Sequence, residues 1–175
     1  MKHKGYFRAA FNRFLHLLAR FGPGATRLRP MLHRLRGVKI HGNVFIGDDV
    51  YLENEYPECV EIHENVQISV RATILAHTRG AGKVIVEKEA YIGPGSIVVT
   101  SGGRVLRIGE GSVIAAGSVI TRDVGAHAFV SGSQAKAIAL ARVPLTKADR
   151  VEDFIRGLVP IRRNRHPNAD GPEPQ

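Results

Sequence analysis

Residues 74–98, ILAHTRGAGKVIVEKEAYIGPGSIV, carry the pattern that decides the fold. Apolar residues recur there at a spacing of six, at Ile74, Val86, Ile92 and Val98. Gly80 stands where the series needs another apolar side chain, and His77 lies just before it. A ladder that stops beside a histidine indicates that the chain leaves the core at this point and forms a loop.

The six-residue period runs from Ile40 to about Gly132 and contains two ten-residue units, at 52–61 and 98–107. Most units begin with Ile, Leu or Val. Neither a helical period of 3.6 nor a strand period of 2.0 would place these apolar residues on one face. The pattern predicts a solenoid in which three units close one triangular coil. The first residue of each unit should point into the core, and Gly or Asn should supply the backbone angles of the corners. The fifth residue should pack a corner: Val44, Val50, Val66, Ala72, Ala90, Ser96, Ser112, Ser118 and Val124.

The composition limits the chemistry of the chain. It has 175 residues, 43% hydrophobic but only 6% aromatic, so the predicted core is aliphatic. The formal net charge of +9 favours anionic partners. Charge alone does not predict nucleic-acid binding, because no interleaved aromatics or known motif accompany it. Cys59 is the only cysteine, which fits a reducing compartment. We therefore expect a cytoplasmic protein, free or at the inner face of the membrane.

Two flanking segments differ from the repeat. Residues 1–37 contain an amphipathic helix over 5–21, ended by Gly22-Pro23-Gly24, and a basic stretch. It begins like a signal peptide, but polar residues interrupt the apolar run, so we expect it to be retained. It either packs on the body or contacts a membrane surface. Residues 139–175 should contain a helix, capped by Thr146, with Val151, Phe154, Ile155 and Leu158 on one face, and then a disordered tail.

The repeat at 38–138, which ends in IGEGSVIAAGSVITRDV (108–124), resembles the hexapeptide-repeat acyltransferases. Residues 38–77, ending in ILAH, further resemble the sugar and polysaccharide O-acetyltransferase branch. The resemblance implies an all-β fold, a left-handed parallel β-helix with helical segments at both ends. General connection rules would predict the right-handed form. It also implies a homotrimer, acetyl-CoA as donor, a sugar or glycan acceptor, and a catalytic histidine at His77.

Folding the ladder locates a site. Units that begin at 52, 74, 92 and 114 should share one face, and those at 62, 80, 98 and 120 the next. His77 then lies at the corner between them, with the insertion Glu55–Cys59 one coil below and Thr100–Arg107 one coil above. Acetyl transfer to a hydroxyl needs a base, and histidine has a suitable pKa. A carboxylate of Glu53, Glu55 or Glu58, or a backbone carbonyl, would orient its second nitrogen.

The remaining site predictions concern ligands. Arg79 and Arg104 should lie beside His77 and could contact an acidic sugar or a sugar phosphate. By resemblance, coenzyme A should run between subunits along the later coils. Its predicted contacts are Gly95, Ala116, Gly117, Ser118, Arg122, Lys136 and Arg142. The corner VSGSQAKAI (130–138) departs from the family's AG-x-PA-[KR] pattern, because Ser133-Gln134 replace the usual residue and proline.

Other functions stay open at this point. A zinc enzyme of the γ-carbonic anhydrase kind would need three converging histidines, but Gly82 stands where a partner of His77 might be, so no metal is expected. His41 and His63 occupy equivalent places one coil apart and should stack on the exterior. A serine or amino-sugar acetyltransferase is one alternative. A non-catalytic trimeric scaffold or membrane-associated adaptor is another.

Overall fold

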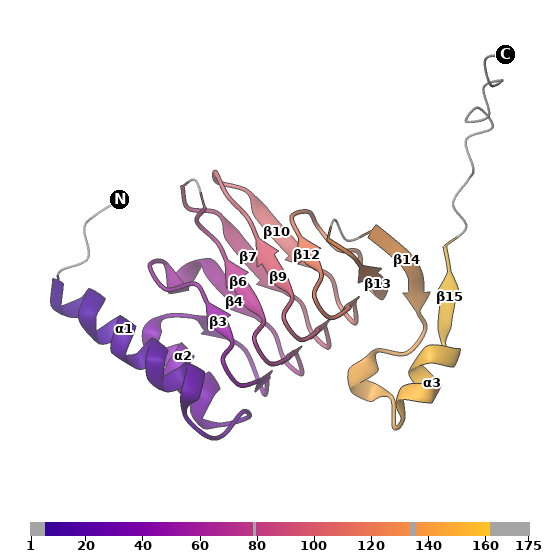
Figure 1. Ribbon diagram of the computed structural model, residues 1–175, viewed down its shortest axis with the longest axis horizontal. Helices are drawn as coiled ribbons and strands as arrows, with labels where there is room; N and C mark the ends of the chain where they lie inside the picture. The colour runs from indigo at the N-terminus through magenta and orange to yellow at the C-terminus, as the bar shows by residue number, and fades with distance from the viewer. Residues whose placement is uncertain (1–5, 79, 134–135, 162–175) are drawn as a thin grey trace, which may run out of the picture.

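The structure, a computed structural model, describes residues 6–78, 80–133 and 136–161, apart from the side chains of 6–9 and 136. Short parallel strands wind into a left-handed β-helix with three faces, as predicted. Figure 1 shows the coils stacked along the long axis, with α1 and α2 at one end and β14, α3 and β15 at the other. Each coil passes through sheets A, B and C in turn.

Four strands form sheet A: β1 (Lys39–Ile40), β4 (Val60–Ile62), β7 (Lys83–Val86) and β10 (Val105–Ile108). Another four form sheet C: β3 (Tyr51–Leu52), β6 (Thr73–Leu75), β9 (Ile97–Val99) and β12 (Val119–Ile120). Sheet B has β2 (Phe45–Ile46), β5 (Gln67–Ile68), β8 (Tyr91–Ile92), β11 (Val113–Ile114) and β13 (Ala128–Ser131). Sheet B continues into β14 (Lys136–Ala141) and β15 (Leu158–Pro160), which pair antiparallel.

Aliphatic ladders fill the interior of the coil. In-register pairing stacks Leu52 on Ile74, Ile74 on Val98 and Val98 on Ile120. The residues at the fifth positions also turn inward, since all nine are at most 7% exposed. Glycine or asparagine takes positive φ at several corners, as predicted, but Asp49, Arg71, Glu89 and His127 do so as well.

The predicted assignment of units to faces is wrong above the second coil. In sheet B, Ile68 pairs with Ile92 and Ile92 pairs with Ile114, whereas Val98 and Ile120 belong to sheet C. The reason is that no strand of the coil begins at Gly80: the chain between β6 and β7, described at 76–78 and 80–82, forms a loop. An insertion as long as one repeat preserves the sequence period while it shifts every later unit by one face.

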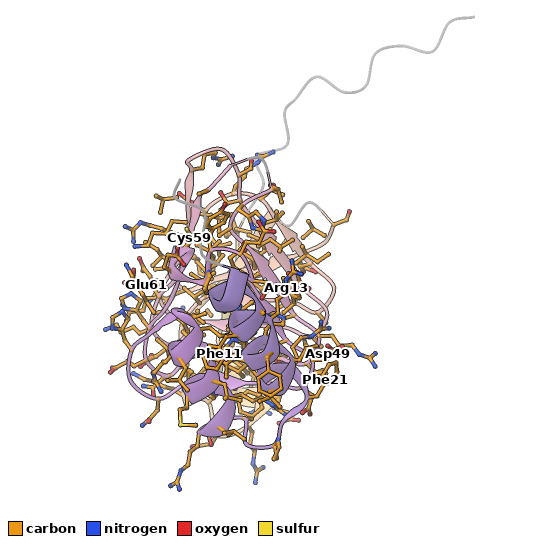
Figure 2. All side chains as sticks on the ribbon, turned by 90° about the vertical axis from the view of Figure 1, so that its left-hand side faces the viewer. Phe11, Arg13, Phe21, Asp49, Cys59 and Glu61 are labelled. Carbon is orange, nitrogen blue, oxygen red and sulfur yellow. The ribbon has the colours of Figure 1, made fainter. Side chains whose placement is uncertain are left out.

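The N-terminal helices close the lower end of the β-helix. Helix α1 (Tyr6–Phe21) packs against α2 (Leu28–Arg36) through a small cluster of Leu15, Ala19 and Leu32. Phe11, Phe14 and Phe21 of α1 face outward, with Phe11 59% and Phe21 66% exposed. Figure 2 looks onto this end and labels both residues. The helix therefore packs on the body, but through a different face from the row of aromatic residues.

A buried polar cluster joins these helices to the first coil. The Arg36 guanidinium contacts His16 Nδ1 at 2.5 Å and His33 Nδ1 at 3.1 Å, and donates to the carbonyls of Leu52 and Glu53. Burial and the nearby Arg36 charge lower the pKa of His16 to about 3, and the same causes hold the pKa of His33 well below its usual value. Both imidazoles are therefore neutral in the folded protein at pH 7.

The C-terminal segment differs in part from the prediction. Helix α3 (Val151–Arg156) is short, and only Phe154 on it is buried, while Val151 and Ile155 are exposed. Thr146 does not cap it: it lies in the 3₁₀ turn η2 (Leu145–Lys147), and its hydroxyl donates to the Glu89 carbonyl. Leu158 begins β15. The tail predicted to be disordered begins at Pro160, but Pro160 belongs to β15 and Ile161 N donates to Ile138 O at 3.0 Å; the rest of it, 162–175, lies outside the described residues.

Within the described part of the chain, no helix combines the length and the apolar character needed to cross a membrane.

Adjacent residues of β10 provide a matched test of the core. Leu106 is 1% exposed and Val105 is 47% exposed. Because truncation inside the coil leaves a cavity, Leu106→Ala should lower the free energy of unfolding by about 3 kcal/mol. Val105→Ala should change it by less than about 1 kcal/mol. Urea unfolding followed by circular dichroism measures both, and equal losses would contradict the buried ladder.

The buried histidines predict a steep acid dependence of stability. Their pKa values are lowered on folding, so the unfolded chain binds more protons once the pH falls below about 6.5. Stability should therefore be fully present above pH 6.5 and decline toward pH 5, by about 1.4 kcal/mol per pH unit for each histidine. His16→Gln should reduce this slope by about one proton. Urea midpoints between pH 7 and 5 measure the slope, and identical slopes for both proteins would rule out the neutral buried His16.

Candidate active site

Three loops leave the β-helix at one corner, where sheet C passes into sheet A. They follow β3, β6 and β9, and their described residues are 53–59, 76–78 with 80–82, and 100–104. Backbone hydrogen bonds stack them: Thr100 N donates to Leu75 O at 3.0 Å, and Gly103 N donates to Ala81 O at 3.0 Å. The predicted placement of the two insertions below and above the His77 loop is confirmed.

His77 and Glu53 form a close pair at this corner. His77 Nδ1 lies 2.5 Å from Glu53 Oε2, and the two residues follow strands that are stacked one coil apart. The side chain of Glu53 is fully buried, whereas that of His77 is 28% exposed. The imidazole is therefore held from the inside and reaches solvent on its other edge. Of the three carboxylates considered from the sequence, Glu53 is the one placed against Nδ1.

Backbone amides hold the Glu53 carboxylate in its ionised form. Oε1 accepts from Glu55 N at 2.9 Å and Tyr56 N at 3.3 Å, and Oε2 accepts from Ala76 N at 2.9 Å. Burial raises the pKa of Glu53, but the hydrogen bonds from His77 and these amides outweigh it and lower the pKa overall. A charged, fixed acceptor at Nδ1 favours the tautomer with its proton on that nitrogen.

Glu55 and Tyr56 lie on the other side of the ring. Glu55 Oε2 is 3.4 Å from His77 Nε2, and the Glu55 side chain is 57% exposed. The Tyr56 ring meets the imidazole edge to face, with centroids 5.4 Å apart. The outer nitrogen of His77 thus faces a solvent-accessible space bordered by one carboxylate and one aromatic ring.

Gly82 closes the His77 loop. Its N–H donates to Ala76 O at 2.6 Å, and a Cβ built on it would lie 2.7 Å from the Arg104 carbonyl oxygen. Glycine is needed because the loop above approaches so closely. Two arginines were predicted to lie beside His77. Arg104 lies in the adjacent loop and is exposed, whereas Arg79 lies outside the described residues.

A cavity of about 440 Å³ lies on the outer face of sheet C. Its lining runs across the sheet to Leu75, next to the His77 loop, and includes two cationic residues. It consists of Arg20, Asp49, Tyr51, Arg71, Thr73 and Leu75.

The predicted cofactor residues occupy several places. Gly95 and Ala116 to Ser118 lie at the corner between sheets B and C, one coil apart, where Gly117 N donates to Pro94 O at 2.9 Å. A Cβ on Gly95 or Gly117 would meet no atom within 4 Å, so the backbone there is open to close approach. Arg122 instead lines a cavity of about 550 Å³ beyond β12.

The other two predicted phosphate contacts lie on or after β14. Lys136 begins this strand opposite Ser131, next to Gly132, whose N–H donates to Ser118 Oγ at 3.3 Å, but its side chain lies outside the described part of the structure. Arg142 follows β14, and its N–H donates to Gly157 O at 3.1 Å. The structure therefore brings the glycine residues to one corner, whereas Arg122 and Arg142 lie elsewhere.

Two residues escaped the sequence analysis. Tyr56 stands in the first ten-residue unit, where an aromatic residue in a loop next to three glutamates was an available signal. Arg36 supports the loop by donating to the Glu53 carbonyl at 2.5 Å. It lies outside the repeat, so no period pointed to it.

Comparisons with curated proteins find acetyltransferases. The chain is 29% identical to serine acetyltransferase 4 of Arabidopsis thaliana over 95% of its own length and 49% of that protein. Serine acetyltransferase 2 of the same plant is 30% identical over 87% of this chain and 50% of that protein. The chain thus spans about half the length of these relatives. No protein-family profile matches it.

Solved structures share the fold. A maltose O-acetyltransferase from Clostridium difficile 630 superposes with a TM-score of 0.55 at 17% identity, covering 75% of this chain and 85% of that one. A galactoside acetyltransferase in complex with coenzyme A gives 0.54 at 16% identity, covering 80% and 84%. The chain is therefore similar to hexapeptide-repeat acetyltransferases in general, and neither the serine nor the sugar branch is singled out.

Proposed function

We propose that this protein transfers an acetyl group from acetyl-CoA to a hydroxyl group, with His77 as the general base. The observation that carries the proposal is the pairing of His77 with the buried Glu53 carboxylate at a corner where three loops meet. The pairing supplies the two properties that a base needs, a fixed tautomer and an accessible second nitrogen. The similarity to named acetyltransferases supports the donor.

The proposed reaction proceeds through addition to the thioester. As the acceptor oxygen attacks the thioester carbonyl carbon, His77 Nε2 takes the hydroxyl proton. Glu53 stays ionised and stabilises the imidazolium that forms. The tetrahedral intermediate then collapses, the carbon–sulfur bond breaks, and the imidazolium returns the proton to the leaving thiolate. The products are an acetyl ester and free coenzyme A.

Glu55 has a different role in this scheme. Its carboxylate lies 3.4 Å from Nε2, on the side from which the hydroxyl would approach. Because the Glu55 side chain is largely exposed, an entering hydroxyl can displace it. We therefore assign Glu53 to positioning the base and Glu55 to the entrance of the site.

We infer that the donor lies between subunits of a homotrimer. Within one chain, sheet C separates the open glycine corner at Gly95 and Gly117 from His77 by about five extended residues, or roughly 16 Å. A neighbouring subunit could bring its glycine corner directly against the His77 corner. Apolar residues on the outer faces support such contacts, among them Phe45, which is 40% exposed, and Ile97, which is 39% exposed.

The acceptor is proposed to be a sugar or polysaccharide precursor. The cavity on sheet C that ends near His77 has Arg20 and Arg71 in its lining and could hold a polar or anionic acceptor. Serine is the second candidate, because the two plant relatives are named serine acetyltransferases. Both acceptors present a hydroxyl group, so the same base chemistry serves either.

His77→Ala should lower the rate of coenzyme A release by about a hundredfold or more, since general-base catalysis contributes 10²–10⁴. The assay is thiol release from acetyl-CoA with a panel of sugars, nucleotide sugars, lipid-linked glycans and serine. The acceptor that stimulates release also separates the sugar proposal from the serine one.

Glu64→Ala is the control, because it removes an exposed side chain between β4 and β5, at a different corner of the β-helix. It should leave the rate unchanged, and both variants should keep the wild-type circular dichroism spectrum. Turnover by His77→Ala close to wild type would overturn the assignment. A wild-type chain that releases no thiol with any acceptor, yet floats with anionic vesicles, would favour a membrane-associated scaffold instead.

A site shared between subunits predicts complementation. His77→Ala and Gly117→Trp should each be inactive, the second because its ring fills the open corner. Trimers reassembled from an equal mixture should recover about a quarter of wild-type activity, since one site in four then combines an intact His77 with an intact glycine corner. Absence of recovery in mixed trimers, verified by native mass spectrometry, would place the whole site within one chain.

A further inference from the structure

Two histidines and a glutamate converge on the outer face of sheet A, away from the corner that holds His77. His41 directly follows β1, and His63 directly follows β4. The register pairs Ile40 with Ile62, so the two histidines are stacked one coil apart. Their ring centroids are 4.9 Å apart, which confirms the stacking expected from the sequence.

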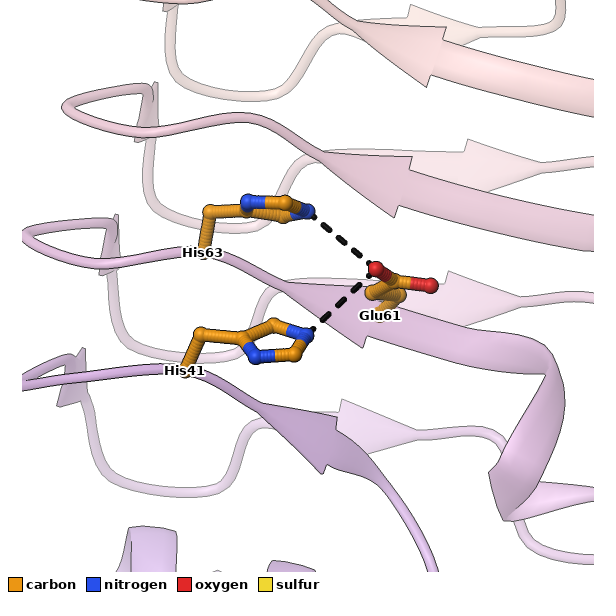
Figure 3. Close-up of side chains that lie close together, drawn as sticks. All are labelled: His41, Glu61 and His63. Atoms are coloured by element: carbon orange, nitrogen blue, oxygen red, sulfur yellow. Dashed lines mark ion pairs between the residues drawn. The ribbon is translucent and has the colours of Figure 1, made fainter.

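Glu61 lies on the same face because it precedes His63 by two residues, and side chains alternate along a strand. Figure 3 shows both rings directed at its carboxylate. His41 Nε2 is 3.4 Å and His63 Nε2 is 3.3 Å from the same oxygen, Oε1. All three donor atoms lie within 4.8 Å of one another.

The two nitrogen–oxygen separations fit the edges of a metal tetrahedron. Zinc binds imidazole nitrogen and carboxylate oxygen at about 2.0–2.2 Å, and a tetrahedron with such bonds has edges of about 3.3–3.5 Å. Two imidazoles and one carboxylate are a common donor set for divalent transition metals. Calcium and magnesium prefer sites built from oxygen donors, so this set selects against them.

A fourth side chain, that of Lys83, contacts the Glu61 carboxylate. Lys83, on the next coil, contacts the second oxygen of Glu61 at 2.7 Å. This hydrogen bond, more than any other influence, lowers the pKa of Glu61. Lys83 therefore fixes the carboxylate orientation and leaves Oε1 directed at the two imidazoles, as outer groups do around metal sites.

We propose that His41, Glu61 and His63 form a site for a divalent transition metal such as Zn²⁺ that clips the first coil of the β-helix to the second. His41 comes from the first coil, and the other two ligands come from the second. A metal bound by residues from both coils stabilises the folded state, because the unfolded chain does not hold the three donors together. The site departs from the expectation that the chain binds no metal, and it is separate from the proposed transfer site.

Zn²⁺ titration of the full, untagged chain tests the proposal, after removal of metal with EDTA and dialysis at pH 7.5. Calorimetry should show one more Zn²⁺ per chain in the wild type than in the double variant His41→Ala/His63→Ala. At a hundredfold excess over its Kd, Zn²⁺ should raise the wild-type Tm by about 5–10 °C, and the double variant should lose this shift. Mg²⁺ at the same concentration should do neither.

Two further variants separate ligation from general effects of charge. Glu61→Gln keeps the shape of the side chain but lowers the affinity, so the stabilisation should need at least about tenfold more Zn²⁺. Glu64→Gln removes an exposed carboxylate nearby and should behave as wild type. The proposal fails if wild type and double variant bind the same number of Zn²⁺ ions, or if Zn²⁺ raises the Tm of both equally.

Discussion

The structure depends on the in-register stacking of coils. Backbone N–H groups of each coil donate to carbonyls of its neighbour, as Gly47 N does to Ile68 O at 2.8 Å. Residues of equal phase are therefore forced into columns, inside as aliphatic ladders and outside as rows of polar side chains. Both candidate sites follow from this constraint. Glu53 and His77 follow strands that are stacked one coil apart, and so do His41 and His63.

The sequence predicted the β-helix because its spacing of six matches no other regular structure. It also predicted that the loops would gather around His77, since insertions are visible as longer units. The face assignment failed at Gly80, because an insertion equal in length to one six-residue unit left the period unbroken. The choice among Glu53, Glu55 and Glu58 was not available from the spacing, because a loop determines which carboxylate turns inward.

The ends of the chain were less predictable for a related reason. A helical period shows which residues share a face, but not whether that face is buried. On α1 the aromatic residues Phe11, Phe14 and Phe21 are exposed, and the smaller Leu15, His16 and Ala19 pack inward. The antiparallel strands β14 and β15 extend sheet B beyond the repeat, and their pairing depends on the exposed edge of β13. No local sequence signal reports that edge.

The buried Glu53 carboxylate links the stability of the fold to the proposed function. Arg36 from the N-terminal helices holds the Glu53 carbonyl, the loop amides hold its carboxylate, and the carboxylate holds His77. The state of the His77 ring is the most direct test of this chain of contacts. In the ¹⁵N NMR spectrum of labelled protein, we expect the neutral form of the His77 ring to carry its proton on Nδ1, and to be a mixture of tautomers in Glu53→Gln. A proton found on Nε2 alone, or a ring unaffected by the Glu53 substitution, would contradict it.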